Sequence, residues 1–203
     1  GSEIALTPPM GWNSWNCWAR DVTQEQVLSS ARAMVESGLI NHGWSYINID
    51  DGWQGKRGGK DNAIQPNTKF PDMKALTREI HDMGLRVGIY STPWVGTYAA
   101  HIGSYSDNPD GENEWIKKGQ HNEHYRYQKE GGNYWKDRRE YYHLGAYSFV
   151  KPDVKQWGEW DIDYLKYDWS PLDYYHVKEM HDALQTLDRD VVYSLSNSAP
   201  YGD

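Results

Sequence analysis

Residues 163–170, Asp-Tyr-Leu-Lys-Tyr-Asp-Trp-Ser, combine the aromatic and aliphatic content of a buried strand with a lysine and an aspartate two residues apart. In a β-strand alternate side chains point the same way, so Tyr164, Lys166 and Asp168 share one face. Burying an unpaired charge costs several kcal/mol or shifts its pKa until the group is neutral. We therefore expect Lys166 to keep Asp168 ionised in a site partly shielded from water, where the carboxylate could act as a nucleophile.

A second group of charges follows the segment Trp-Ser-Tyr-Ile-Asn-Ile-Asp at residues 44–50. Asp50 and Asp51 are adjacent carboxylates at the end of a predicted strand, and each can accept hydrogen bonds from neighbouring hydroxyl groups. Asp51 followed by Gly52 is also good turn chemistry, so a capped turn is the alternative interpretation.

Strands and helices alternate along the chain, which is typical of βαβ units and a parallel sheet. Thr23 and Gln26 can form a capping box, and Gly84 can end a helix. The predicted strands cover residues 10–15, 44–50, 85–90, 162–168 and 191–196, and the predicted helices cover residues 23–37, 73–83, 153–160 and 172–187.

The polar and aromatic residues of interest fall at the carboxyl ends of these strands, where parallel α/β enzymes bind their ligands. They are Trp15, Asp50, Tyr90, Asp168 and Ser196. No glycine-rich phosphate loop follows any strand, so we favour a (β/α)8 TIM-barrel type over a doubly wound sheet. A whole barrel needs about 250 residues, so the 203 residues of this chain are expected to form a single partial barrel domain with the first five strands.

The segment 92–152 follows the third predicted strand and shows no clear helical or strand periodicity. Long loops within compact domains are often functional. We expect this insert to form a lid or a substrate-binding wall at the active-site end, and a decoration without ligand contact is the alternative.

Composition narrows the function. The net charge of −8 argues against a nucleic-acid partner. The sequence contains no apolar run long enough to predict a membrane span. The chain has eleven Trp and sixteen Tyr but only two Phe. Trp and Tyr combine a flat apolar face with a hydrogen-bonding edge, as sugar-binding surfaces require, and packing in the core is the alternative for each of them. The single cysteine, Cys17, permits no internal disulfide.

Four segments together resemble glycoside hydrolase family 27, the retaining α-galactosidases and α-N-acetylgalactosaminidases. They lie at successive predicted strand ends: Leu-Thr-Pro-Pro-Met-Gly-Trp-Asn-Ser-Trp at residues 6–15, Ile-Asp-Asp-Gly-Trp at 49–53, Gly-Ile-Tyr at 88–90 and Tyr-Leu-Lys-Tyr-Asp at 164–168. The resemblance implies a retaining exo-glycosidase that removes terminal α-linked galactose-type sugars through a covalent glycosyl-aspartate intermediate, without a cofactor or metal.

The resemblance also implies roles for individual residues. Asp168 would be the nucleophile, and Lys166 would contact the sugar hydroxyls. Asp50 and Asp51 would hold the far side of the sugar ring. The apolar face of the sugar would lie on Trp15, and Tyr90 would line the pocket.

At the end of the fifth strand, the resemblance aligns Ser196 and Ala199 with the residues that sense the 2-position of the sugar. Small residues there are typical of members that act on N-acetylgalactosamine, so this specificity is an alternative to galactose. Gly52 stands where eukaryotic members carry a cysteine paired near the first strand. This difference leaves Cys17 unpaired and favours a bacterial periplasmic or secreted protein.

The acid/base aspartate of the family follows the sixth strand, outside this chain. We therefore expect the chain alone to lack activity and to need the missing half of the barrel, from the same polypeptide or another chain. Two other classes stay open: a metal-dependent barrel enzyme with Asp50, Asp51 and Asp168 as oxygen ligands, and a non-catalytic sugar-binding fragment.

Overall fold

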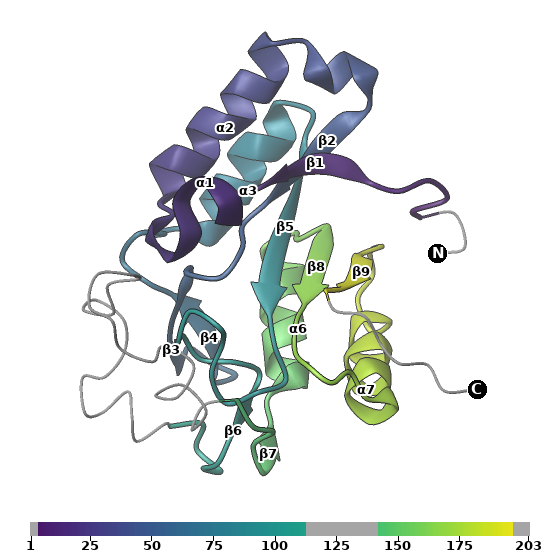
Figure 1. Cartoon of the computed structure of the whole chain (residues 1–203). Helices are drawn as coiled ribbons and strands as arrows, with labels where there is room; N and C mark the ends of the chain where they lie inside the picture. Colours follow the sequence, from purple (N-terminus) through teal and green to yellow (C-terminus); the bar gives the residue numbers. More distant parts are fainter. Residues whose placement is uncertain (1–3, 113–141, 197–203) are drawn as a thin grey trace, which may run out of the picture.

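The computed structural model describes residues 4–112 and 142–196, and the main element of this part is a curled parallel sheet (Figure 1). Its strands occur in the order β1-β2-β5-β8-β9, and every neighbouring pair is parallel. They are β1 (Met10–Asn13), β2 (Trp44–Asn48), β5 (Arg86–Ser91), β8 (Tyr164–Tyr167) and β9 (Val192–Leu195). A doubly wound sheet reverses its strand order at a switch point. Here chain order and sheet order agree throughout, which confirms the barrel type.

In the described part of the chain, one long helix lies between each two successive strands of this sheet. These helices are α2 (Gln24–Glu36), α3 (Met73–Asp82), α6 (Val150–Glu159) and α7 (Tyr174–Leu184). The predicted capping box of α2 is present, because Thr23 Oγ1 accepts from the Gln26 amide and Gln26 Oε1 accepts from the Thr23 amide. Gly84 follows the end of α3 with a φ of 84°, a left-handed conformation that glycine adopts without strain.

The hydrophobic core lies between these helices and the outer face of the sheet. Helix α2 buries Val27, Ala31 and Met34, which recur at the three- and four-residue spacing of one helical face. The strands contribute aliphatic and aromatic side chains that are 1% exposed or less: Ile47, Ile49, Val87, Ile89, Leu165 and Tyr167. Alternate strand residues therefore point away from the helices, toward the interior of the barrel.

Several predicted element boundaries were wrong by two or three residues, among them the end of the first strand and the start of α6. Residue Trp15 was predicted to end the first strand, but β1 ends at Asn13 and Trp15 begins the short helix α1 (Trp15–Trp18). Helix α6 was predicted to begin at Asp153, after Pro152, but it begins at Val150. Proline lacks an amide hydrogen, and the first-turn amides of a helix need no helical partner. Pro152 therefore fits in the first turn.

The segments between the barrel strands carry short antiparallel pairs that the sequence analysis did not predict. Strands β3 (Gln54–Gly58) and β4 (Ala63–Pro66) form a hairpin after β2. Within the predicted insert, β6 (Tyr105–Ser106) pairs with β7 (Tyr147–Ser148). Both pairs are grouped near the arrowhead of β5 in Figure 1, at the carboxyl end of the sheet. The part of the insert at residues 113–141 lies outside the described residues.

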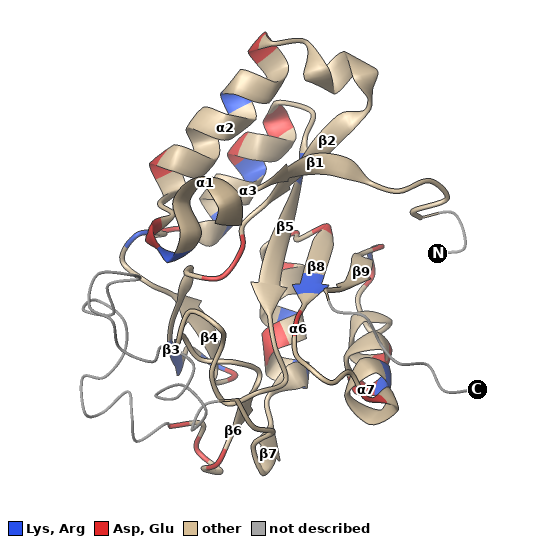
Figure 2. Ribbon diagram, viewed as in Figure 1, with Lys and Arg blue, Asp and Glu red and all other residues tan. Residues whose placement is uncertain are grey.

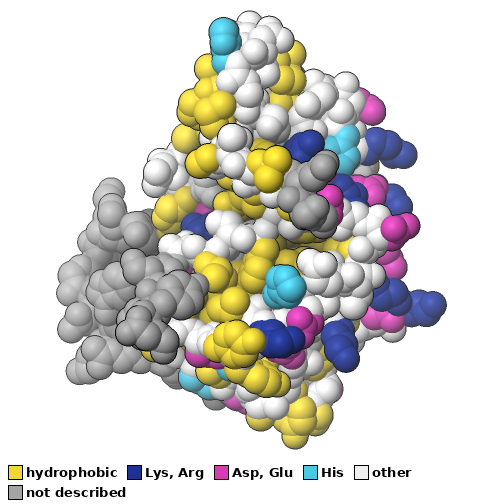
Figure 3. All heavy atoms as spheres, turned by 90° about the vertical axis from the view of Figure 1, so that its right-hand side faces the viewer, with side chains coloured by type: hydrophobic (Ala, Val, Ile, Leu, Met, Phe, Trp, Pro, Cys, Tyr) yellow, Lys and Arg dark blue, Asp and Glu magenta, His cyan; other side chains and the backbone are white. Residues whose placement is uncertain are grey.

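Within the described part of the chain, β1 and β9 are the edge strands of the sheet. Figure 3 looks onto the side of the molecule that carries β9 and α7, and hydrophobic side chains extend across the middle of that face. The search for a helix that is long and apolar enough to cross a membrane, made over the described residues, found none.

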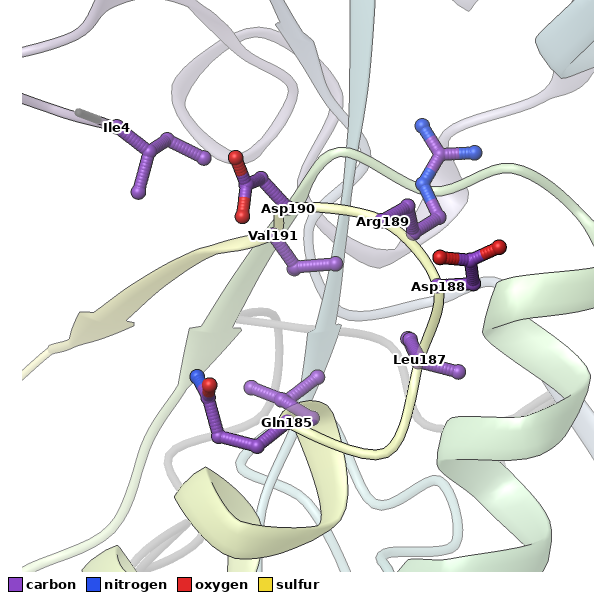
Figure 4. A pocket seen from close by; sticks show the side chains of 8 residues that line it. Ile4, Gln185, Leu187, Asp188, Arg189, Asp190 and Val191 are labelled. Carbon is purple, nitrogen blue, oxygen red and sulfur yellow. The ribbon is translucent and has the colours of Figure 1, made fainter. Parts of the chain in front are cut away.

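The amino end of the sheet is held by ion pairs on the connection from α7 to β9. Arg189 donates from Nη1 to Asp161 at 2.8 Å and from Nη2 to Asp163 at 2.6 Å, and His81 Nε2 lies 2.6 Å from Asp163 Oδ2. A cavity of about 380 Å³ borders this connection (Figure 4), lined by Ile4, Leu184, Gln185, Leu187, Asp188, Arg189, Asp190 and Val191. In barrels this end of the sheet contributes to stability.

Candidate active site

The inner face of β8 carries the lysine that the sequence singled out. Lys166 is paired in register with Tyr90 of the neighbouring strand β5, and its Nζ lies 5.3 Å from the centre of the Tyr90 ring. Lys166 is the basic residue of β8, whose sequence is Tyr-Leu-Lys-Tyr, and Figure 2 shows the Lys and Arg colour on this strand. The side chains on either side of Lys166, Leu165 and Tyr167, are buried in the core. Lys166 therefore points into the barrel, as predicted.

Asp50 lies two residues after the end of β2 and is 2% exposed. Its Oδ2 accepts from Lys166 Nζ at 2.8 Å and from Asn13 Nδ2 at 2.8 Å, and its Oδ1 accepts from the Asp51 amide at 2.8 Å. The Asp50 amide donates to Ser14 Oγ at 2.9 Å. The carboxylate is thus held by groups from the ends of β1 and β8, which fixes its position across the sheet.

Asp168 follows β8 and is 8% exposed. Tyr90 Oη donates to Asp168 Oδ2 at 3.0 Å, and the Asp168 amide donates to the carbonyl of Ser91 at 3.0 Å. Tyr90 is 1% exposed, and its carbonyl accepts from Trp53 Nε1 at 3.0 Å. Burial raises the pKa of the Tyr90 phenol well above its ordinary value, and the nearby charges of Asp51, Asp168 and Asp50 raise it further. Tyr90 is therefore a neutral donor to Asp168.

Lys166 acts on Asp168 in the expected direction, but its charge does not outweigh the effect of burial. Burial raises the pKa of Asp168 above its ordinary value, while the charge of Lys166 and the hydrogen bond from Tyr90 lower it without cancelling the effect of burial. The ammonium of Lys166 makes its close ion pair with Asp50. Since one lysine faces several carboxylates, its charge only partly offsets the desolvation of Asp168.

Asp51 is 1% exposed, and the first residues of the insert surround its carboxylate. Oδ1 accepts from Thr97 Oγ1 at 2.8 Å, and Oδ2 accepts from the Ala99 amide at 2.7 Å. His101 Nδ1 lies 3.3 Å from Oδ1. Gly52 follows with a φ of 123°, and a Cβ atom there would lie 2.6 Å from the Arg20 carbonyl oxygen. A side chain at position 52 would therefore collide with the Arg20 backbone unless one of the two segments shifted.

Trp15 and Ser196 are the other predicted site residues in the described part of the chain, and each is held by a hydrogen bond from its backbone amide. Trp15 is half-buried, and its amide donates to Asn13 Oδ1 at 2.9 Å, which links it to Asp50 through the Asn13 amide group. Ser196 is exposed directly after β9, and its amide donates to the Tyr167 carbonyl at 3.2 Å. Ala199 lies outside the described residues, so the interpretation of the 2-position pocket stays a prediction.

The sequence analysis missed Asn13 and Thr97 as site residues. Asn13 stands within the Gly-Trp-Asn-Ser-Trp segment, and its amide can both donate and accept, which was the available signal. Thr97 follows β5 by only six positions, yet a loop without periodicity gives no indication of which residues turn back toward the sheet. Its role became visible only from its contact with Asp51.

A metal site was the alternative use of these carboxylates. Over residues 4–112 and 142–196, no group of three or more His, Cys, Asp or Glu side chains is arranged to hold a metal ion. Asp50 instead has an ammonium and an amide as neighbours. These donors hold the Asp50 carboxylate in place, and an ionised carboxylate can accept hydrogen bonds from neutral hydroxyl groups.

A curled parallel sheet with carboxylates, a lysine and aromatic residues at its carboxyl ends defines part of a (β/α) barrel with polar groups at its ligand-binding end. The comparisons with known proteins agree: residues 7–116 match the family described as "Alpha galactosidase A". The chain belongs to this family, and it corresponds to the N-terminal region of the glycoside hydrolase family 27 barrel.

Individual relatives support the assignment. Alpha-galactosidase A of Cellvibrio japonicus is 33% identical over 199 residues, which cover 95% of this chain and 39% of the relative. Alpha-galactosidase I of Mortierella vinacea shares the fold with a TM-score of 0.71 at 31% identity, over 96% of this chain and 41% of that structure. The alpha-galactosidase of Saccharomyces cerevisiae, solved with raffinose, gives 0.70 at 26% identity, over 96% and 36%. The chain thus spans about two fifths of the length of these relatives.

Proposed function

We propose that the protein carrying this chain is a retaining exo-α-galactosidase, with Asp168 as the nucleophile. The observation that carries the proposal is the arrangement at the strand ends: Asp168 hydrogen-bonded to Tyr90, with Lys166 and Asp50 paired beside them. In most retaining glycosidases the nucleophile is a carboxylate, and in barrel enzymes catalytic residues lie at the carboxyl ends of the strands. The printed names of the relatives and of the raffinose complex support α-galactosides as the substrate class.

In the proposed reaction Asp168 attacks the anomeric carbon, the bond to the leaving oxygen breaks, and a covalent glycosyl-aspartate forms. Water then attacks the same carbon and releases Asp168, so two inversions give net retention. Lys166, Asp50 and Asp51 would bind the sugar hydroxyls, and Trp15 would support its apolar face. The acid that protonates the leaving oxygen is not among the residues of the described site.

The test uses the full-length protein and a 2-deoxy-2-fluoro α-galactoside with a good leaving group. Mass spectrometry of the labelled peptide should place the label on Asp168, and a label on Asp50 or Asp51 would contradict the assignment. Asp168→Asn should remove essentially all turnover without lowering the melting temperature at pH 7. Because burial raises the pKa of Asp168, its ionised form opposes folding above that pKa, and asparagine removes this cost.

A further inference from the structure

The insert begins with a short turn whose donors are directed at Asp51. Residues 97–101 close on themselves, because the Thr97 amide donates to the His101 carbonyl at 2.8 Å and the Ala100 amide donates to the Thr97 carbonyl at 2.9 Å. Thr97 Oγ1 also accepts from the His101 amide at 2.9 Å. The Ala99 amide and the Thr97 hydroxyl are the donors that point out of the turn, and both donate hydrogen bonds to the Asp51 carboxylate.

The turn is itself fixed to the barrel from two sides. The Gly103 amide donates to the Val95 carbonyl at 3.1 Å, and the Ser104 amide donates to the Thr92 carbonyl at 2.8 Å. The Ser104 hydroxyl lies 2.8 Å from that of Ser91 at the end of β5. The Gly103 carbonyl accepts from Arg57 Nη2 at 2.7 Å. Thr97 and Ser104 are fully buried, so the turn cannot move without breaking contacts within the core of the site.

The arrangement controls which way the Asp51 carboxylate faces. Each carboxylate oxygen of Asp51 accepts one hydrogen bond from the turn: Oδ1 from the Thr97 hydroxyl and Oδ2 from the Ala99 amide. A carboxylate oxygen has a second lone-pair site, so each can still accept from a hydroxyl group. Two fixed donors prevent rotation about the Asp51 side chain, and Asp50 beside it is held by different partners, Lys166 and Asn13. The two adjacent carboxylates are therefore positioned by separate parts of the fold.

We propose that Thr97, with the Ala99 amide and His101, positions Asp51 for binding of the terminal sugar. This inference rests on the proposed galactosidase function and assigns a specific role to the start of the insert. Thr97 is a positioning residue, because it acts through Asp51 and need not touch the sugar. Its hydroxyl is required twice, as the donor to Asp51 and as the acceptor from the His101 amide.

The test compares Thr97→Val with Thr97→Ser in the full-length protein, using p-nitrophenyl α-galactoside as substrate and galactose as inhibitor. Losing a hydrogen bond to a charged group typically corresponds to about a 10-fold to 100-fold change in binding. Thr97→Val, which keeps the shape of threonine, should raise KM and the galactose inhibition constant within that range, with a smaller change in kcat. Thr97→Ser keeps the hydroxyl and should restore both constants to within about threefold of the wild type.

Ser104→Ala is the matched control, because it removes a buried hydroxyl contact from the same segment without touching Asp51. It should lower the melting temperature like Thr97→Val but leave KM and the inhibition constant unchanged. If Thr97→Val does not fold, His101→Leu removes the imidazole 3.3 Å from Asp51 and should change the same two constants in the same direction.

The outcomes separate the two proposals. If the wild-type protein is active and Thr97→Val has the same KM and galactose inhibition constant as the wild type, Thr97 does not position Asp51. The proposed function would then still stand. Equal changes in Thr97→Val and Ser104→Ala would also overturn the positioning role, since the effect would then come from general loosening of the turn. A wild-type protein that neither hydrolyses α-galactosides nor binds galactose overturns both proposals.

Discussion

The buried ion pair between Arg57 and Asp153 allows a quantitative prediction about how the β3–β4 hairpin is held against α6. Arg57 Nη1 donates to Asp153 Oδ1 at 2.7 Å and Nη2 donates to Oδ2 at 3.0 Å, and the two side chains are 3% and 0% exposed. Asp153 Oδ1 also accepts from the Ile64 amide at 3.0 Å, and the guanidinium lies 4.3 Å from the centre of the Phe149 ring. The pair thus joins the β3–β4 hairpin to α6.

Asp153→Ala would leave the guanidinium of Arg57 buried without its counter-charge. Removing one partner of a buried ion pair costs about 3–5 kcal/mol of unfolding free energy. The orphaned Ile64 amide would add about 1–3 kcal/mol if the two losses were independent, but contacts that share one carboxylate are not additive. We therefore expect a loss of about 3–5 kcal/mol for this variant.

Urea unfolding of the full-length protein measures this loss, provided that the slope against denaturant is unchanged. Lys155→Ala is the matched control: Lys155 Nζ lies 2.6 Å from Asp61 Oδ2 and joins the same two parts of the fold, but both side chains are well exposed. Exposed pairs contribute little. A loss in Asp153→Ala no larger than in Lys155→Ala would refute the reasoning. The double variant Arg57→Met/Asp153→Leu gives a second test. If its loss of unfolding free energy equals the sum of the losses in Arg57→Met and Asp153→Leu, the two side chains do not stabilise each other and the reasoning is refuted.

Two further predictions concern the site itself. Tyr90→Phe removes a hydrogen bond to the ionised form of Asp168, so the pKa of Asp168 should rise further and the acidic limb of the kcat/KM profile should move to higher pH; an unmoved limb would count against Asp168 as the titrating group. Asn13→Leu removes the donor to Asp50 and the acceptor for the Trp15 amide, so kcat/KM on an α-galactoside should fall at least about 10-fold, whereas wild-type kinetics would show that Asn13 does not position these residues.

Much of the barrel could be predicted because its signals are local. Thr23 and Gln26 lie three residues apart and form the capping box by themselves, and the apolar alternation of each strand reflects its own burial. The carboxyl-end positions of Asp50, Tyr90 and Asp168 followed from the strand ends, since parallel strands bring their carboxyl ends together. These parts of the site therefore needed no knowledge of contacts between distant residues.

The other features of the fold depend on contacts between residues far apart in the chain, which no local sequence pattern predicts. Arg57 and Asp153 are 96 positions apart, and each is an ordinary charged residue in its own segment. The β3–β4 hairpin turns through Gly59 and Asn62, which have positive φ values of 69° and 57°, but its strands contain Lys56 and Arg57 and lack alternation. Pairing with the partner strand, not the apolar pattern, decides that this segment is extended.

The three buried aspartates at the carboxyl ends of β2 and β8 are stabilised in three different ways, and the difference bears on their proposed roles. An ammonium and two amide groups hold Asp50, while a turn of the insert holds Asp51 by a hydroxyl, a backbone amide and an imidazole nearby. Asp168 accepts from the neutral phenol of Tyr90, and burial still raises its pKa. A carboxylate held by fixed donors is suited to binding hydroxyl groups, and the raised pKa of Asp168 reflects desolvation that its neighbours do not cancel. Perturbed pKa values are concentrated at functional sites, so the raised pKa of Asp168 supports its proposed role as the nucleophile.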